Sequence, residues 1–496
     1  MSTLSGELGG ASLRSNRADA NRDDARALNL LQQFGQTATA FQTMAPGMRH
    51  WFDTTSLSGG FDRATATESF VAAARSKSNE TRDIGFVGFV DTGAAWVVAG
   101  EPVAARADAI AVAERFVNYA HANKKRVAFF ATEGVLASSP RFRRVLIGEQ
   151  PTWNPAEWPT ILAANRSLRE QLRRARAKGV HVRALSADEM ESGATSVRLE
   201  LNGILRRWLA TRLMTSMHFL VAPEPFVHLE RRQLFVAERN GRPIAFLSAA
   251  PVAARNGWLF EHLLRDPSAP NGSAELLVDC AMKSLADQGV RWVTLGLAPL
   301  AGPVSGWLRA TRTIARPFFN FAGLAAFKRK LRPSNWEPIY LAYPRERWSI
   351  WAMRDGLRAF AGGSLLLFGA RTVLRGPKPL LRALEYSLIP WTLALAMWPP
   401  APWFPKASLK WAWVVFDVLL WSALFTLRKQ WTQRLAIAIA ATVTLDAVVT
   451  LVQALLWNVS RTRTLLEAAL VVVACSGPAL AAAVLWGAVR RRSIIV

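Results

Sequence analysis

Cysteine is scarce in this sequence: the chain has only Cys280 and Cys475, which lie far apart in apolar surroundings. Neither a disulfide framework nor a thiol-rich metal site can be built from two such residues. The six histidines show no metal-ligand spacing, so we expect no metal site; they are His50, His121, His181, His218, His228 and His262.

Acidic residues are also few relative to basic ones. The 36 Asp and Glu residues stand against 61 Lys and Arg residues, which gives a formal net charge of +25. Such an excess predicts attraction to a polyanion, either nucleic acid or an anionic lipid surface. Three catalytic signatures are missing as well: the Gly-x-Ser-x-Gly motif, the P-loop and the dinucleotide fingerprint. Hydrolase, kinase and dehydrogenase functions therefore lose their usual sequence support.

The N-terminal segment has no apolar core. Residues 1–27 are rich in Ser, Ala, Arg and Asp, so we interpret them as a disordered tail rather than a secretory signal. With 496 residues the chain is too long for one ordinary core. Two soluble units followed by a membrane part are the natural division.

Long hydrophobic runs are concentrated near the C-terminus. Trp411–Leu427, Leu435–Trp457 and Leu465–Val489 are almost wholly apolar and flanked by basic residues, as membrane spans are. Tyr386–Trp398 is a weaker candidate for a fourth span. Four spans put the basic flanks on one side, so we predict a membrane region of about four helices over residues 384–496, with the soluble region in the cytoplasm.

Two further features surround these spans. Asp417, Asp446 and Glu467 lie within them and mark either a polar pathway or carboxyl groups bonded near helix ends. Upstream, residues 346–383 mix tryptophan and leucine with arginine, which is typical of an amphipathic interfacial linker.

The region between these ends alternates short β-branched or aromatic runs with helical stretches. This pattern predicts a mixed α/β (α+β) protein with two similar halves, residues 28–190 and 191–345. In the first half we expect strands over Gly85–Val90, Ala95–Ala99 and Arg126–Ala131 and a helix over Ala107–Ala122. In the second half we expect strands over Gln233–Glu238, Pro243–Pro251, Gly257–Leu264 and Trp292–Leu297, a hairpin turn at Asn240-Gly241, and a helix over Ser273–Gln288.

One predicted helix, over residues 165–179, carries an arginine stripe. Helical spacing puts Arg166, Arg169, Arg173 and Arg176 on one face, opposite Leu168, Leu172 and Ala175. Guanidinium groups in a row are suited to binding successive phosphates. A solvated helix face explains the same pattern equally well.

A second candidate site lies where the strand over Gly257–Leu264 leads into the next helix. Ser273 is placed to cap this helix, whose free N–H groups suit an anion, although an ordinary turn explains the segment too. Glu261 and Arg265, four residues apart, are expected on one strand face. Such a pair suits an amino group and a phosphate or ester oxygen, but the residue pattern alone favours a surface salt bridge.

Several motifs in order carry a family resemblance. The sequence from about Leu30 to Tyr343 resembles the C-terminal catalytic domain of the bacterial phosphatidylglycerol lysyltransferases, the multiple peptide resistance factors. The motifs are Trp96–Pro102, Ile147–Glu149, the arginine helix to Gly179, Arg265 with Pro270–Gly272, Leu295–Leu300, Gly323 through Phe327–Lys330 to Pro333, and Trp336-Glu337. The resemblance implies a tandem of two acetyltransferase-like (GNAT) folds, followed here by a C-terminal helical transmembrane bundle.

The resemblance also implies an activity. Aminoacyl-tRNA would be the donor and co-substrate, an anionic phospholipid such as phosphatidylglycerol the acceptor, and no other cofactor or metal would be needed. Glu261 would meet the donor's ammonium group and Arg265 would steady the ester or phosphate, as the catalytic pair. Substrate-binding candidates are Glu149, Arg166, Arg169, Arg173, His262, Asn271, Gly272, Lys328, Lys330 and Trp336, with both lysines facing phosphate. The expected location is the bacterial inner membrane, as a multi-pass protein with its soluble domain in the cytoplasm.

Two departures from the family limit what carries over. The family has an Asp-Leu-Met-Arg motif where this chain has Glu261 to Arg265 with His262 at the Asp position, so the transferred amino acid stays open. The usual N-terminal spans are replaced by C-terminal ones, and lipid flipping is not carried over. Two other functions remain alternatives: an acyl-CoA-dependent N-acyltransferase, and a non-catalytic membrane sensor of lipid or tRNA.

Overall fold

The computed structural model describes most of the chain. The described residues are 22–56, 81–191, 196–212, 215–315, 319–374, 378–397, 399, 403–429 and 432–495. They form two compact units. Unit 1 takes in the described parts of Met1–Ile204, Met217–Arg316 and Asn320–Leu365, and unit 2 those of Leu205–Ser216, Pro317–Phe319 and Leu366–Val496.

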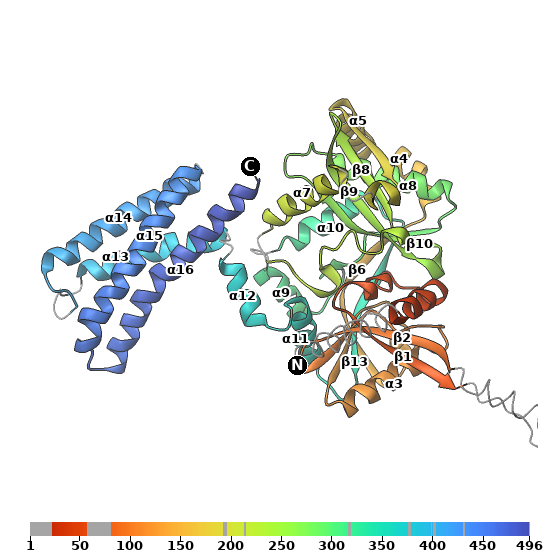
Figure 1. The fold of residues 1–496 in the computed structure, drawn as a ribbon, viewed down its shortest axis with the longest axis horizontal. Helices are drawn as coiled ribbons and strands as arrows, with labels where there is room; N and C mark the ends of the chain where they lie inside the picture. Colours follow the sequence, from red (N-terminus) through yellow and green to blue (C-terminus); the bar gives the residue numbers. More distant parts are fainter. Residues whose placement is uncertain are drawn as a thin grey trace, which may run out of the picture. The chain divides into compact units, whose positions relative to one another are not determined.

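Unit 1 is built on one mixed sheet of 13 strands, in the order β1-β2-β3-β5-β13-β6-β11-β10-β9-β8-β7 (Figure 1). The short strands β4 and β12 pair with β2 and β6. The strands are β1 (Arg49–Ser56), β2 (Thr81–Asp91), β3 (Ala95–Ala99), β4 (Val103–Ala104), β5 (Arg126–Thr132), β6 (Phe142–Trp153), β7 (Val180–Leu185), β8 (Gln233–Arg239), β9 (Arg242–Val252), β10 (Gly257–Arg265), β11 (Trp292–Thr294), β12 (Ala298–Pro299) and β13 (Asn335–Pro344).

Helices cover both faces of this sheet. The labelled helices of unit 1 are α3 (Ala109–Ala122), α4 (Trp158–Ala164), α5 (Arg166–Ala177), α6 (Ala187–Glu191), α8 (Ser273–Asp287), α9 (Gly306–Ala315), α10 (Phe321–Lys330) and α11 (Ser349–Phe360). The residues of α7 (Ser196–Ala210) are divided between the two units. The predicted strands and helices of both halves are all present, with ends shifted by a few residues.

The first half follows the expected order. Strands β1, β2 and β3 are antiparallel, α3 crosses over, and β5 returns parallel to β3. The helix forms because its apolar residues recur every three or four positions, and this stripe is buried against the sheet: Ala109, Val112, Ala113, Phe116, Val117 and Ala120.

The second half repeats this order. Strands β8, β9 and β10 are antiparallel, and β11 runs parallel to β10 after the crossover helix α8. The turn at Asn240-Gly241 joins β8 and β9 with positive φ values of 53° and 73°, as a type I′ turn requires. This confirms the predicted hairpin. Strand β11 ends at Thr294, three residues earlier than expected.

Two segments cross the boundary predicted at residues 190 and 191. Strand β13, from the end of the second half, pairs with both β5 and β6 of the first half. Conversely, β7 pairs with β8, and α5 packs beside α8 (Figure 1), in a core that includes Leu168, Leu277 and Phe235. The hydrophobic cores therefore do not divide at the predicted boundary. Long-range strand pairing decides which segments of the chain belong to each core.

The N-terminal tail was predicted to reach residue 27. Residues 1–21 lie outside the described part, but residues 22–34 form a helix. Arg26 on this helix binds Asp83 through two hydrogen bonds of 2.6 and 2.9 Å, and its guanidinium lies 3.9 Å from the centre of the Phe52 ring. Residues 22–27 therefore belong to the folded unit.

Unit 2 consists mainly of helices. They are α12 (Leu365–Leu374), α13 (Lys378–Met397), α14 (Ala407–Lys429), α15 (Gln433–Gln453) and α16 (Leu465–Ile495). Leucine and alanine side chains of α14, α15 and α16 share one apolar core, and α13 packs against α14 and α16.

Three helical segments of the described chain are long and apolar enough to cross a membrane: Ala407–Leu427, Gln433–Arg461 and Leu465–Arg490. They contain the three spans predicted with most weight, and only 22% of the apolar window of each is buried, which leaves side chains on each helix to face lipid. Helix α13 contains most of the predicted fourth span but is not among the helices that are long and apolar enough to cross a membrane. Four spans thus stay a prediction.

Candidate functional site

Glu261 lies at an irregularity of β10. In the pairing with β9, Phe260 is opposite Ala249 and His262 is opposite Ser248, so Glu261 is an extra residue in a β-bulge. A bulge shifts the side-chain alternation of the strand that follows it. Bulges often re-aim a side chain next to a functional site.

The bulge separates Glu261 from Arg265. Arg265 is opposite Ala245, whose side chain joins the core beneath α8. Glu261 instead contacts Gln42 of the 3₁₀ helix η1 (Phe41–Met44), which packs on the other face of the sheet. The prediction that Glu261 and Arg265 share a strand face is therefore wrong, because alternation was counted without the extra residue.

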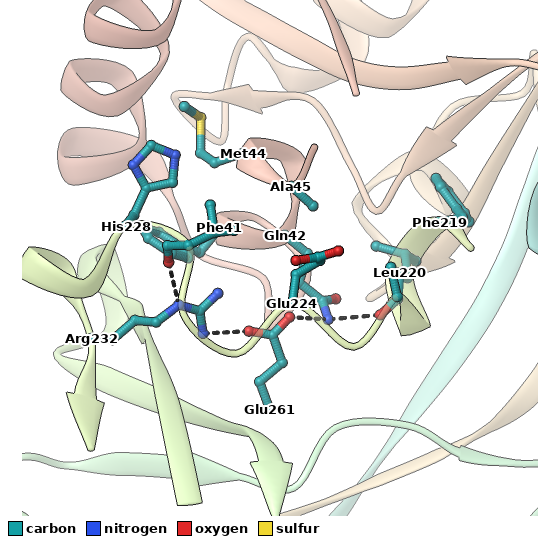
Figure 2. Close-up of a pocket in the computed structure, with 12 residues that line it drawn as sticks. Phe41, Gln42, Met44, Ala45, Phe219, Leu220, Glu224, His228, Arg232 and Glu261 are labelled. Carbon is teal, nitrogen blue, oxygen red and sulfur yellow. Dashed lines mark hydrogen bonds and ion pairs between the residues drawn. The ribbon is translucent and has the colours of Figure 1, made fainter. Parts of the chain in front are cut away.

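Glu261 is held by two partners that the sequence did not reveal (Figure 2). Arg232 donates a hydrogen bond of 2.6 Å to one carboxylate oxygen, and Gln42 donates one of 2.9 Å to the other. The Glu261 and Arg232 side chains are only 9% and 5% exposed. Arg232 also donates to the carbonyl oxygen of Val227, and Gln42 to that of Leu220. Arg232 and Gln42 therefore tie the loop over residues 220–227 to Glu261.

The surroundings favour the ionised form of Glu261 and the neutral form of its neighbour His262. Burial alone would raise the pKa of Glu261, but the charges of His262 and Arg232 and the hydrogen bonds to the carboxylate outweigh burial and lower this pKa. Burial lowers the pKa of His262. The His262 imidazole therefore loses its charge more easily than a free histidine, which leaves Arg232 as the lasting counter-charge of Glu261.

A small pocket opens above Glu261. Figure 2 shows its residues converging from η1, from the loop before β8 and from β10. The apolar part of the lining includes Phe41, Met44 and Phe219. Glu224 and His228 add polar groups, and among the described residues the Glu224 carboxylate has no hydrogen bond or ion pair. The pocket thus has one neutralised carboxylate and one that is available.

A second polar region lies at the start of α8, on the Arg265 face of β10. Arg265 donates a hydrogen bond of 3.1 Å to Asn271, so these two predicted residues are adjacent. Gly272 is the N-cap residue, with φ of 99°, and a Cβ atom there would lie 3.0 Å from the Gln171 carbonyl oxygen of α5. The predicted cap Ser273 is instead the first helical residue, and its hydroxyl donates to the carbonyl oxygen of Pro270.

Glu275 occupies the anion-favouring end of α8. It lies in the first turn and is buried, where it accepts hydrogen bonds of 3.0 Å from Gln171 and 2.8 Å from Lys330. A carboxylate at this position satisfies the positive end of the helix. Lys330, predicted to face phosphate, is thus paired within the protein.

The arginine helix α5 forms as predicted. Leu168, Leu172 and Ala175 are buried, and the Asn165 side chain caps the helix by accepting from the N–H of Leu168. The four predicted arginines lie outward but differ in their contacts. Arg176 binds the buried Asp279 at 2.7 Å, and Arg173 binds Glu170 at 2.8 Å.

Two arginines of α5 are less engaged. Arg169 donates to the carbonyl oxygens of Leu162 and Ala163, which cap the preceding helix α4. Arg166 is exposed and has no ion-pair partner in the described part of the chain. The outer face of α5 therefore keeps positive charge that can meet phosphate.

Lys328 lies inside the protein rather than facing phosphate as predicted. Its ammonium nitrogen donates to the carbonyl oxygens of Leu295, Gly296 and Leu297 over 2.7 to 2.9 Å. Burial lowers the pKa of Lys328 to about 7. Three acceptors match the three N–H donors of an ammonium group and offset part of the cost of burial. Lys328 thus fixes α10 to the segment after β11.

Glu149 and Trp336 lie close to this segment. Glu149 on β6 is opposite Ala298, and its carboxylate packs against Gly302. Trp336 on β13 packs against a small cluster that includes Ala298 and Ala325. Neither residue reaches the Glu261 pocket, so the predicted site residues occupy at least three places in unit 1.

The comparison with known families decides the identity of this region. The family model "Phosphatidylglycerol lysyltransferase, C-terminal" matches residues 62–343. The chain belongs to this family. This membership confirms the resemblance seen in the sequence motifs. The family consists of transferases that act on a phospholipid.

Solved structures agree on the fold of this lysyltransferase-family chain. The C-terminal domain of a putative lysylphosphatidylglycerol synthetase from Agrobacterium fabrum is 22% identical, with a TM-score of 0.54, over 70% of this chain and 99% of that one. The L-PGS of Bacillus licheniformis is 18% identical, with a TM-score of 0.52, over 70% and 97%. No curated protein sequence matches the chain significantly. The predicted mixed α/β fold, with two halves that repeat one order of strands and crossover helix, is confirmed.

Proposed function

We propose that this family member is a membrane-bound aminoacyltransferase that moves an amino acid from aminoacyl-tRNA to the headgroup of an anionic phospholipid such as phosphatidylglycerol. Family membership supplies the transferase class and the phospholipid. The donor is our proposal, and one observation carries it: the pocket above Glu261 contains a carboxylate, that of Glu224, available for a cation.

An aminoacyl ester carries an ammonium group beside its reactive carbonyl. Glu261 was predicted to meet this group, but its charge already pairs with Arg232. Glu224 is exposed and lines the same pocket, next to Glu261 and Gln42 in Figure 2. We therefore assign the ammonium group to Glu224, and we give Glu261 the task of holding the pocket wall. Phe41, Met44 and Phe219 would receive the apolar part of the amino acid.

The reaction exchanges one ester for another. The lipid hydroxyl oxygen forms a bond to the acyl carbon, the bond from this carbon to the terminal ribose oxygen of the tRNA breaks, and the hydroxyl proton moves to that ribose oxygen. Ester exchange needs little driving force, so positioning and stabilisation of the oxyanion supply the catalysis. Neither a metal nor a further cofactor takes part in this scheme.

The body of the RNA would bind on the α5 side of the sheet, and its aminoacylated end would pass the sheet edge to reach the Glu224 pocket on the other face. Arg166, Arg169 and Arg173 form the exposed arginine row, and Arg265 with Asn271 lies at the start of the adjacent helix α8. Contacts of this kind position an RNA backbone without reading its sequence. The formal net charge of +25 favours both polyanionic substrates.

The acyl-CoA alternative has weaker support. A pyrophosphate would need the free N–H groups at the start of α8. In this chain the Glu275 carboxylate lies in that first turn, and α5 packs directly on Gly272. An incoming anion would have to displace both.

The basic residues that flank the spans support a cytoplasmic position for unit 1, at the inner membrane of a bacterium. Charged tRNA is available on that side. The proposed donor and the proposed orientation are therefore consistent with each other.

The experiment is a transfer assay with the full chain in phosphatidylglycerol vesicles, supplied with a mixture of labelled aminoacyl-tRNAs. We expect label in the lipid fraction with the natural chain and at least a tenfold loss of kcat/KM with Glu224→Gln. Glu230→Gln is the matched control, because Glu230 is an exposed glutamate of the same loop outside the pocket lining. Equal activity of all three proteins would refute the role of Glu224, and no transfer by the natural chain would refute the donor.

A further inference from the structure

Helix α11 and the residue before it expose an unusual amount of apolar surface. Trp348 is 77% exposed, Ile350 61%, Trp351 52% and Leu357 47%. Side chains of this size in one short segment form a contiguous apolar patch, and such patches on soluble surfaces are uncommon and mark interaction sites. We name this patch, from Trp348 to Leu357, the α11 surface.

The opposite side of α11 is firmly seated on the sheet. Ala352, Asp355, Gly356 and Ala359 are buried. Arg126 of β5 binds Asp355 through two hydrogen bonds of 2.8 and 2.5 Å. The helix is thus an integral part of unit 1 rather than the linker expected over residues 346–383, and whatever binds the α11 surface also orients unit 1.

Arginines surround the α11 surface. Arg354 lies on its exposed side, with its guanidinium 5.3 Å from the Trp351 ring centre. Arg345, which follows β13, is exposed a few residues before this segment. Exposed Arg143, opposite Tyr343, lies on the sheet face that carries α11. Of the acidic residues here, Glu346 is exposed, whereas Asp355 is buried and paired with Arg126.

We propose that the α11 surface lies in the interface of an anionic lipid bilayer and binds unit 1 to it, as a contact additional to the spanning helices. Tryptophan and arginine are the residues that favour this interface, with aromatic rings at headgroup level and guanidinium groups on lipid phosphates. We take a bilayer to be what covers the α11 surface, because only Ala361–Ser364 separates α11 from α12. Helix α12 leads into the rest of unit 2, which contains the candidate membrane spans. Leu366, the second residue of α12, is 88% exposed. This inference does not depend on the reaction that unit 1 catalyses.

The test measures quenching of a fluorescent label by lipids that carry a spin label near the headgroup. The full chain, with Cys280 and Cys475 replaced by alanine, is labelled at Ile350→Cys and reconstituted into vesicles with phosphatidylglycerol. The matched control is Asn118→Cys, an exposed position on α3, which covers the other face of the same sheet.

We expect quenching at Ile350→Cys at least several-fold greater than at Asn118→Cys, and weaker quenching at Ile350→Cys in vesicles of zwitterionic lipid alone. Equal, low quenching at both positions would overturn the proposal. If unlabelled Ile350→Cys chains cross-link to each other and the labelled chain shows no quenching, a second copy covers the α11 surface. This result also overturns the proposal. Quenching that does not depend on anionic lipid would refute the role of the arginines.

Discussion

Arg232 binds Glu261 at 2.6 Å, with both side chains almost fully buried. Removing one partner of a buried ion pair strands the other charge, at a typical cost of about 3–5 kcal/mol. We therefore expect Arg232→Met to lower the unfolding midpoint of the protein in detergent markedly. The double variant Arg232→Met/Glu261→Gln should recover part of this loss, because no charge is then left unpaired. A single variant as stable as the natural chain would contradict the pairing.

Lys328 gives a pH dependence. Its pKa of about 7 in the folded state lies below the ordinary value of 10.5, so the unfolded chain binds more protons between these two pH values. Stability contributed by Lys328 should therefore rise as the pH increases from about 7 towards 10, by up to about 1.4 kcal/mol per pH unit. The stability difference between the natural chain and Lys328→Met, measured by denaturant unfolding, should follow this rise. A constant difference across the range would show that Lys328 stays charged.

Gly272 tests the contact between α5 and α8. Its φ is 99°, and an added Cβ would meet Ala175 and Gln171 at 3.0 Å, so we expect Gly272→Ala to destabilise the protein by about 2–3 kcal/mol. Gly241→Ala is the control, because Gly241 has φ of 73° but open space around it. It should cost about 1 kcal/mol. Equal thermal shifts for the two variants would mean that α5 does not press on the start of α8.

The exposed arginine row of α5 should carry the salt dependence of RNA binding. Replacing Arg166, Arg169 and Arg173 with glutamine should weaken tRNA binding and reduce the slope of log affinity against log salt by about 2–3. Triple replacement of Arg239, Arg242 and Arg291, which are also exposed, is the charge-matched control. Filter binding over a salt series measures both. If the control lowers the slope as much, net charge rather than α5 attracts the RNA.

Local structure was largely predictable because it depends on neighbouring residues. The residue pattern predicted the helix over Ala107–Ala122, found as α3, and Asn240-Gly241 predicted the hairpin. The buried face of α5 and the three long apolar helices followed from the same kind of periodicity. Side-chain pattern encodes these features directly.

The long-range features were not predictable from one sequence. No local signal indicates that β13 inserts between β5 and β6, since this pairing joins residues about 190 positions apart. The bulge at Glu261 leaves no mark in the alternation, and Arg232 resembles any surface arginine ahead of a strand. Lys328 has an ordinary basic sequence around it, although its ammonium group is enclosed. The pocket depends on two of these features, the bulge at Glu261 and its pairing with Arg232.

Mass analysis of lipids from cells with and without this chain tests the central claim most directly. If the chain transfers amino acids to phospholipid, extracts from expressing cells contain an anionic phospholipid heavier by one aminoacyl group, and this species is lost with Glu224→Gln but kept with Glu230→Gln. Identical lipid profiles with and without the chain, in both acid and neutral growth, would contradict the account.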